Sequence, residues 1–282
     1  MPRQSSAELA AAIQTPVRQR LDASVPRRVL QIDMLAAGAS AYYDADQESQ
    51  VVIANADNIV GPQRVRGHRA MLQDIEVATT LQIPISQYQN MTLTQLEDRI
   101  QNNAQQNLVA QENEMFFRLL DFSRELCENE SFTAYNQDEF KYNFSRMFAA
   151  IEKFDLQPSS LICNNKKVNQ FADLMTNAAR RLEIISCDLC DRDTFYILPE
   201  PQYLGVLAIR SDLTCIPADD PAHLMIGWVF FENIGMAILH PSCFVRCNYT
   251  LSFEQEDTNR RFKNKYDYFN KMWKNEDEVT FA

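Results

Sequence analysis

The clearest pattern along the chain is a long series of apolar residues that recur every three or four positions. The series begins at Leu93 and runs to Leu126, and no Gly or Pro interrupts it. This spacing predicts an amphipathic helix, and Thr92 with Gln95 predicts a capping box at its first turn. A helix of about 34 residues would be about 50 Å long. Eight of the thirteen residues from 101 to 113 are Asn or Gln, so its polar face can meet water or another protein surface.

The second half of the chain alternates between the periods of helices and strands. Two shorter amphipathic helices are expected at about 137–154 and 167–182. Short strands are expected around and after them, at 161–163, 195–198, 203–209, 224–231, 236–239 and 245–253. The predicted class is therefore α+β.

The first 88 residues have a weaker pattern. Residues 1–27 show no hydrophobic stripe and predict an extended arm, with one short helix at 6–13 before Pro16. Residues 29–88 are β-like and have no clear core of their own, which is uncommon inside a compact domain. Because ordering each residue costs about 1–2 kcal/mol, we expect a projecting segment that another subunit helps to order.

Composition narrows the class of protein. The chain has 282 residues, of which 46% are apolar and 23% are charged, so it can bury a core. Its longest apolar run, about eight residues from Leu224 to Phe231, is far shorter than the roughly 20 that span a membrane. Seven cysteines in a long chain favour reduced thiols over a disulfide scaffold.

Charge is distributed unevenly along the chain. The net charge is -11, which disfavours general binding of nucleic acid by the body of the protein. Residues 1–28 are basic instead, with five arginines. The first lysine is Lys141, so every basic side chain before it is an arginine or a histidine.

Catalytic motifs are missing from the sequence. There is no phosphate-binding glycine loop, no Gly-x-Ser-x-Gly and no His-Glu-x-x-His. The three histidines, His68, His223 and His240, lie in different contexts and offer few candidates for a general base. These observations favour a structural or binding protein over an enzyme.

Two clusters have alternative interpretations. Cys187, Cys190, Cys243 and Cys247, with His240 beside them, contain enough ligands for a tetrahedral zinc site, but free thiols are the favoured interpretation. Asp219 and Asp220 precede Pro221, which predicts a turn, although a carboxylate pair could also hold a cation.

A third cluster is basic. Arg64, Arg66, His68 and Arg69 form the densest group of positive residues. They could contact phosphates, form Arg–carboxylate pairs with another subunit, or lie in a solvated turn. We expect pairs between subunits, because the rest of the chain is acidic.

The order of the elements and two stretches of sequence resemble the major capsid proteins of tailed bacteriophages, which have the Hong Kong 97-type (HK97-like) fold. Residues 158–165, Pro-Ser-Ser-Leu-Ile-Cys-Asn-Asn, lie between two predicted helices, where the family has a buried strand that ends in Asn. Residues 203–211 and 225–228 are similar to the family's Leu-x-Gly-x-Pro-Val pattern and the glycine that follows it. Here Leu207 replaces a common proline.

The resemblance implies a division of the chain into the parts of that fold. We expect an N-terminal arm (1–28), an extended loop with flanking strands (29–88), a peripheral domain with the long spine helix (89–131), an axial domain (132–240) and C-terminal strands of the peripheral domain (241–282). The subunit interface would include Arg18, Arg20, Arg64, Arg66 and Arg69.

The resemblance also implies a function. We expect a non-enzymatic shell protein, without metal or cofactor, that forms hexamers and pentamers of an icosahedral virion capsid in the host cytoplasm. Its partners would be itself, packaged double-stranded DNA on the inner face, a portal and a separate scaffolding protein, with no membrane. The alternatives are an encapsulin-like nanocompartment shell and a cytosolic zinc-containing enzyme.

Three expectations about assembly follow. Deleting residues 1–27 should leave a folded subunit that assembles poorly. Because the sequence starts at Met1, we expect no scaffolding domain ahead of it. Some capsids of this fold are cross-linked by an isopeptide bond from a lysine of the extended loop, but this loop has no lysine, and an arginine cannot supply the amine.

Overall fold

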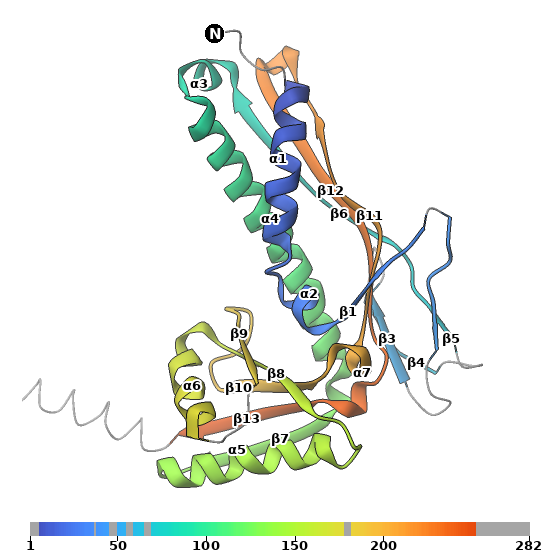
Figure 1. Ribbon diagram of the computed structural model, residues 1–282, viewed down its shortest axis with the longest axis vertical. Helices are drawn as coiled ribbons and strands as arrows, with labels where there is room; N and C mark the ends of the chain where they lie inside the picture. Colours follow the sequence, from blue (N-terminus) through green and yellow to red (C-terminus); the bar gives the residue numbers. More distant parts are fainter. Residues whose placement is uncertain are drawn as a thin grey trace, which may run out of the picture.

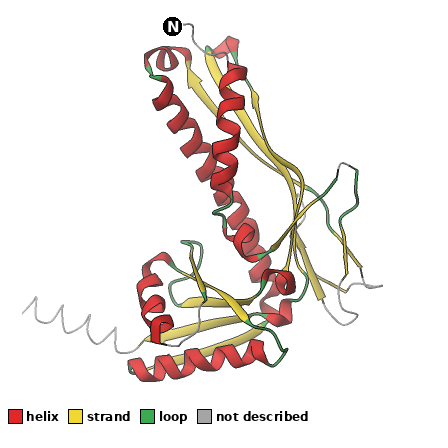
Figure 2. Ribbon diagram, viewed as in Figure 1, coloured by secondary structure: helices red, strands yellow, loops and turns green. Residues whose placement is uncertain are grey.

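The computed structural model describes residues 6–36, 38–44, 50–54, 59–64, 69–177 and 182–251. Figure 1 shows an elongated upper body, a lower lobe of helices and strands, and a pair of strands that projects to one side. Both helices and long strands build the upper body (Figure 2), so the α+β class is confirmed.

The upper body is a sheet covered by helices on one face. Its longest helix, α4 (Leu93–Phe122), has 30 residues and begins with the predicted capping box. The backbone N–H of Gln95 donates to the Thr92 hydroxyl (3.3 Å), and the N–H of Thr92 donates to the Gln95 side chain (3.2 Å). Beside α4 lie α1 (Ser6–Leu21), α2 (Val25–Val29) and α3 (Ile85–Asn90).

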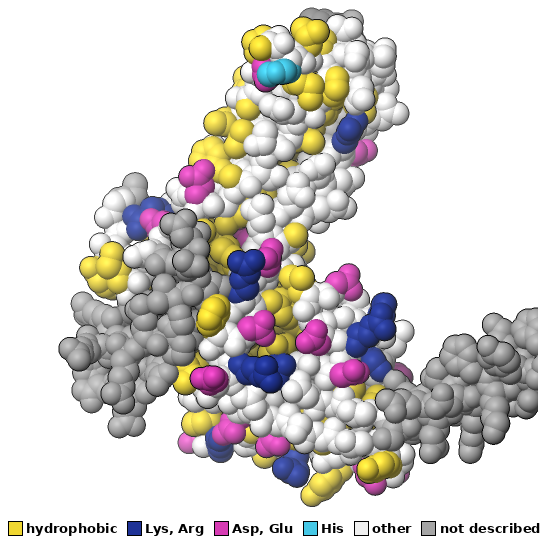
Figure 3. Space-filling view, turned by 180° about the vertical axis from the view of Figure 1, so that it is seen from behind, with side chains coloured by type: hydrophobic (Ala, Val, Ile, Leu, Met, Phe, Trp, Pro, Cys, Tyr) yellow, Lys and Arg dark blue, Asp and Glu magenta, His cyan; other side chains and the backbone are white. Residues whose placement is uncertain are grey.

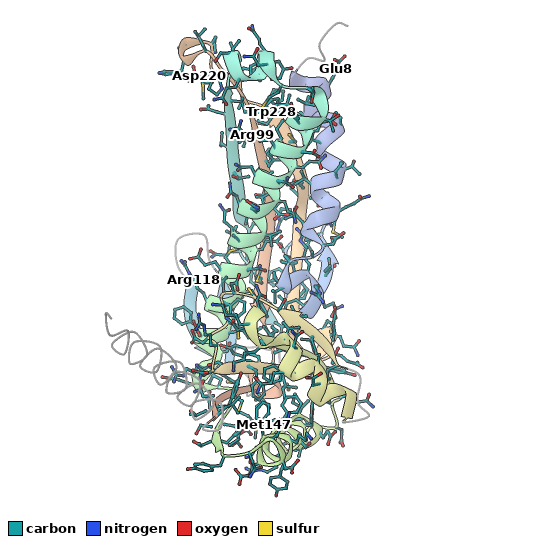
Figure 4. All side chains as sticks on the ribbon, turned by 90° about the vertical axis from the view of Figure 1, so that its left-hand side faces the viewer. Glu8, Arg99, Arg118, Met147, Asp220 and Trp228 are labelled. Carbon is teal, nitrogen blue, oxygen red and sulfur yellow. The ribbon has the colours of Figure 1, made fainter. Side chains whose placement is uncertain are left out.

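Three long strands form the sheet under these helices. They are β6 (Ile75–Pro84), β11 (Gly205–Pro217) and β12 (Met225–Ile238), with β12 antiparallel to both neighbours. Their inner faces and the helices share one core, which contains Ile100, Trp228 and Ile234. Asp220 lies at the far tip of this body, and Met147 lies at the opposite end of the molecule (Figure 4).

The lower lobe has a second core between a five-stranded sheet and two helices. Phe144, Phe171 and Phe195 are fully or almost fully buried there, and the centroids of the Phe171 and Phe195 rings are 5.2 Å apart. The sheet contains β7 (Glu128–Ala134), β13 (Val245–Leu251), β10 (Thr194–Pro199), β8 (Pro158–Cys163) and β9 (Glu183–Ser186), and the helices are α5 (Gln137–Glu152) and α6 (Val168–Asn177).

The projecting segment leaves the upper sheet at its lower end. It contains β1 (Gln31–Met34), β2 (Tyr42–Asp44), β3 (Gln50–Ala54), β4 (Ile59–Arg64) and β5 (Arg69–Met71). Strands β2 and β5 pair only with each other among the described strands. By contrast, β1 pairs with β11, and β3 continues the upper sheet beside β12. The short helix α7 (Pro201–Leu204) precedes β11.

The N-terminal segment differs from its prediction. It is not an extended arm, because α1 covers Ser6–Leu21 with Pro16 inside the helix. The segment also has the hydrophobic stripe that the sequence analysis missed, since Leu9, Ile13, Val17 and Leu21 are all completely buried. Burial of this stripe against α4 and β11 outweighs the backbone hydrogen bond that a proline removes.

Two strand predictions also need correction. Residues 224–231 and 236–239 are not separate strands but one continuous strand, β12. Residues 75–84, expected to lack a core of their own, form β6 and bury Ile75, Val77 and Ile83 in the upper core. In the described part of the chain, no helix is both long enough and apolar enough to cross a membrane.

Candidate functional site

The four cysteines of the zinc hypothesis do not form a site. Cys187 and Cys190 belong to the upper core, whereas Cys247 belongs to the core of the lower lobe. Cys187 and Cys190 lie in the turn between β9 and β10, whereas Cys247 lies on β13 and Cys243 precedes that strand. Within the described residues, no group of three or more His, Cys, Asp or Glu side chains could hold a metal ion.

The cysteines are free thiols, and six of the seven are buried. Burial raises the pKa of Cys163 to about 11 and the pKa of Cys215 to about 12. Cys243 is the one with intermediate exposure. Buried thiols with a raised pKa are poor nucleophiles and poor metal ligands, so they act as small apolar side chains.

The acidic pair at the tip of the upper body closes a turn, as predicted. Asp220 accepts hydrogen bonds from the backbone N–H groups of Ala222 (3.1 Å) and His223 (3.3 Å), and its carboxylate lies 2.7 Å from Nδ1 of His223. Asp219 accepts from the N–H of Gly227 at 3.2 Å. Both carboxylates thus have structural roles in the turn between β11 and β12.

Of the five arginines predicted at a subunit interface, one has a described side chain. Arg18 forms ion pairs within its own subunit, with Asp22 on α1 and with Asp212 on β11. The side chains of Arg20, Arg64, Arg66 and Arg69 lie outside the described residues, as does the contact that was predicted for His68.

A buried ionic cluster connects the N-terminal segment to the upper body. The side chains of Arg27 on α2, Glu112 on α4 and Glu232 on β12 are fully buried. Nη2 of Arg27 lies 2.7 Å from Oε1 of Glu112 and 2.6 Å from Oε2 of Glu232. Nε of Arg27 donates to Glu112 at 2.9 Å, and the Ser24 hydroxyl also donates to Glu112.

Two carboxyl groups share one guanidinium in this cluster, and water does not reach them. Burial and the nearby Glu112 raise the pKa of Glu232 to about 9, although Arg27 opposes the rise. At neutral pH Glu232 therefore keeps its proton. A proton on Glu232 lowers the negative charge that the cluster holds out of water, which lowers the cost of burying it.

No motif or spacing in the sequence indicated this cluster. Glu232 offered the only signal, because it is a charged residue inside an apolar strand sequence. Its partners are distant in sequence, 205 residues away for Arg27, so the pairing depends on the folded chain.

Large apolar side chains are exposed in several parts of the molecule. At the base of the projecting segment, Met34 is 57% exposed and Met71 is 54% exposed. Leu224 is 66% exposed at the tip of the upper body, and Tyr142 on α5 is 69% exposed in the lower lobe. Figure 3 shows charged side chains gathered over the lower lobe, while this face of the upper body is mostly apolar or uncharged.

Comparisons with known proteins identify the fold. No family model matches the sequence, and no curated protein matches it. Among solved structures, a virus-like particle from Pyrococcus furiosus matches with a TM-score of 0.62 and 15% identity, over 86% of this chain and 100% of that one. A structure from Mycobacterium phage Bobi matches with a TM-score of 0.56 and 9% identity, over 80% and 89% of the two chains.

The capsid of an empty GTA particle is a further match, with a TM-score of 0.53 and 10% identity over 81% of this chain and 90% of that one. These matches extend over both lobes, since each covers at least four fifths of the chain. The chain therefore has the Hong Kong 97-type capsid fold.

Proposed function

We propose that this protein is the major capsid protein of a tailed bacteriophage, which forms hexamers and pentamers of an icosahedral head around double-stranded DNA. The observation that carries the proposal is the coverage of the capsid fold. The chain spans 89% of the phage Bobi chain and 90% of the GTA capsid chain, so no major part of that fold is missing.

The surface of the subunit supports self-association. Its exposed apolar side chains include residues of the projecting segment, the upper tip and α5, and a closed shell requires contacts in several directions from each subunit. The division into arm, extended loop, peripheral domain and axial domain belongs to the proposal. In that division, Arg64, Arg66 and Arg69 on the loop, together with Arg20, pair with carboxylates of a neighbouring subunit, whereas Arg18 is already paired within its own subunit.

An encapsulin-like nanocompartment shell is the second candidate. One observation favours it: the virus-like particle from Pyrococcus furiosus has the higher TM-score, 0.62, and is covered completely by this chain. Such a shell would enclose protein cargo instead of a genome. The subunit contacts would be of the same kind, so the content of the particle separates the two candidates.

Electron microscopy of the purified protein, expressed alone and with its neighbouring genes, tests the proposal. We expect closed shells with five-fold and six-fold capsomers, and nuclease-resistant double-stranded DNA in particles from the native source. Closed shells that contain protein but no protected DNA would support the nanocompartment. A protein that stays monomeric under all conditions, with its fold intact by circular dichroism, would contradict both candidates.

A surface substitution tests whether the projecting segment takes part in assembly. Met71→Ser removes an exposed side chain from the end of β5, and Gln73→Ser is the matched control two residues further along. We expect Met71→Ser to raise the protein concentration needed for assembly, with no change in the thermal stability of the free subunit. Equal assembly of both variants would show that Met71 does not contribute to subunit contacts.

A further inference from the structure

The N-terminal segment, residues 6–30, is fixed to the upper body in two ways. Helix α1 buries its apolar stripe against α4 and β11. Helix α2 is held by Arg27, whose guanidinium contacts Glu112 and Glu232, and by Ser24. The apolar contact does not respond to pH, whereas the ionic contact contains groups that can gain or lose a proton.

The geometry of the cluster favours a proton on Glu232. Within the described residues, Oε1 of Glu232 is buried and accepts no hydrogen bond. An ionised carboxylate would leave that oxygen unsatisfied in a site that water does not reach, at a high cost in free energy. A protonated carboxyl group lowers this cost because it is neutral, and burial together with the nearby Glu112 raises the pKa of Glu232.

Among the described residues, no second cation contacts the two glutamates and neutralises them in place of that proton. Arg27 is the only cation that contacts the two glutamates among the described residues. Asp212 on β11 acts electrostatically on Arg27, and Asp212 is itself paired with Arg18 on α1. Loss of the proton from Glu232 to solvent therefore changes the cluster from neutral to a buried net charge of about -1, which no nearby group neutralises.

We propose that the Arg27–Glu112–Glu232 cluster is a proton-dependent latch, which holds the N-terminal helices on the upper body and loosens as the pH rises. When α2 moves away, both carboxylates reach water and ionise freely. The released state therefore binds one proton fewer than the latched state. The inference concerns the subunit itself and does not depend on the proposed shell function.

The sign of the pH effect follows from the pKa of Glu232. The latched state has a pKa of about 9, and the open state has the ordinary value of about 4.3. Between these values the latched state binds more protons, so the opening equilibrium shifts toward release by up to tenfold per pH unit. From pH 6 to pH 8 we expect a 10- to 100-fold rise in the opening of residues 6–29.

Hydrogen–deuterium exchange with mass spectrometry measures this opening directly. Exchange in peptides from 6–29 is compared at pH 6 and pH 8, after correction for the intrinsic chemical rate. Peptides from α5 in the lower lobe serve as the internal reference. In the wild-type protein, protection of 6–29 should fall 10- to 100-fold at the higher pH, while protection of α5 stays the same.

Three variants assign the effect to the cluster. Glu232→Gln keeps an acceptor for Arg27 and a donor for Glu112 but cannot ionise, so its protection of 6–29 should not change between the two pH values. Glu112→Gln leaves one carboxylate beside Arg27 and should also remove most of the change. Glu114→Gln is the matched control, because Glu114 is an exposed residue of the same helix that pairs with Arg118, and it should behave like the wild type.

Two results would overturn the proposal. One is equal protection of residues 6–29 at both pH values in the wild-type protein, which needs no variant to fold. The other is a pH-dependent loss in Glu232→Gln that matches the wild type.

Discussion

Substituting one residue of α1 tests whether the N-terminal segment is part of the folded subunit. Ile13 is completely buried in the upper core, so Ile13→Ala removes its apolar contacts and leaves a cavity. Such substitutions cost about 2–5 kcal/mol. A domain has a free energy of unfolding of about 5–15 kcal/mol, so the loss is a large fraction of the total.

The assay is urea unfolding of subunits kept below the concentration at which they associate. Trp228 is buried in the same core and reports unfolding by its fluorescence. Gln19→Ala is the matched control, because Gln19 is exposed on the same helix and its change should stay within about 0.5 kcal/mol. If Ile13→Ala lowered the free energy of unfolding no more than Gln19→Ala, α1 would not contribute to the upper core. The N-terminal segment would then not be part of the folded subunit.

The same burial changes the expectation for the deletion of residues 1–27. The deletion removes Leu9, Ile13, Val17 and Leu21, and burying each such side chain is worth about 1.5–3 kcal/mol. It also removes Arg27 and leaves Glu112 and Glu232 without a cation. We now expect a truncated subunit that fails to fold stably, and not one that folds but assembles poorly.

Three further predictions concern covalent bonds, thiols and the long helix. Boiling assembled particles in detergent with reducing agent should give one band at the monomer mass of 32.6 kDa, because no lysine precedes Lys141; a covalent ladder would contradict this. Native protein at pH 7.5 should alkylate Cys243 first, and equally fast modification of Cys163 would show that the lower core opens readily. Thr92→Ala should cost about 1 kcal/mol in urea unfolding, whereas the exposed neighbour Thr94→Ala should cost less, and equal losses would mean that the cap does not stabilise α4.

Helices α4 and α5 could be predicted from local sequence signals, because the residues that define them lie close together in the chain. The capping box at Thr92 placed the start of α4 correctly, because the cap bonds only to residues nearby in sequence. The period of residues 137–154 also predicted α5, whose buried face includes Phe140, Phe144 and Met147. These elements depend on a period that is visible in the sequence alone.

The upper body was harder to predict, because two of its residues contradict local rules. Pro16 suggested a helix end, although the residues on both sides of it continue one buried stripe. The strand predicted at 224–231 stopped before Glu232, although β12 continues through this residue and burial together with Glu112 raises the pKa of its carboxyl group. In both places, packing against distant parts of the chain overrides the local preference.

Strand β12 changes its neighbouring strand from β6 to β3 along its length, and this change affects where the sheet can bend. Residues 225–234 of this strand pair with β6, and Ala237 and Ile238 pair with β3. Between these two ladders, Gly235 and Met236 pair only with β11 among the described strands. At Gly235 and Met236 the sheet is thus joined by the β11 ladder alone among the described strands, so we expect bending of the sheet to be concentrated at those two residues. A subunit built in this way can meet neighbours at different angles without breaking either ladder.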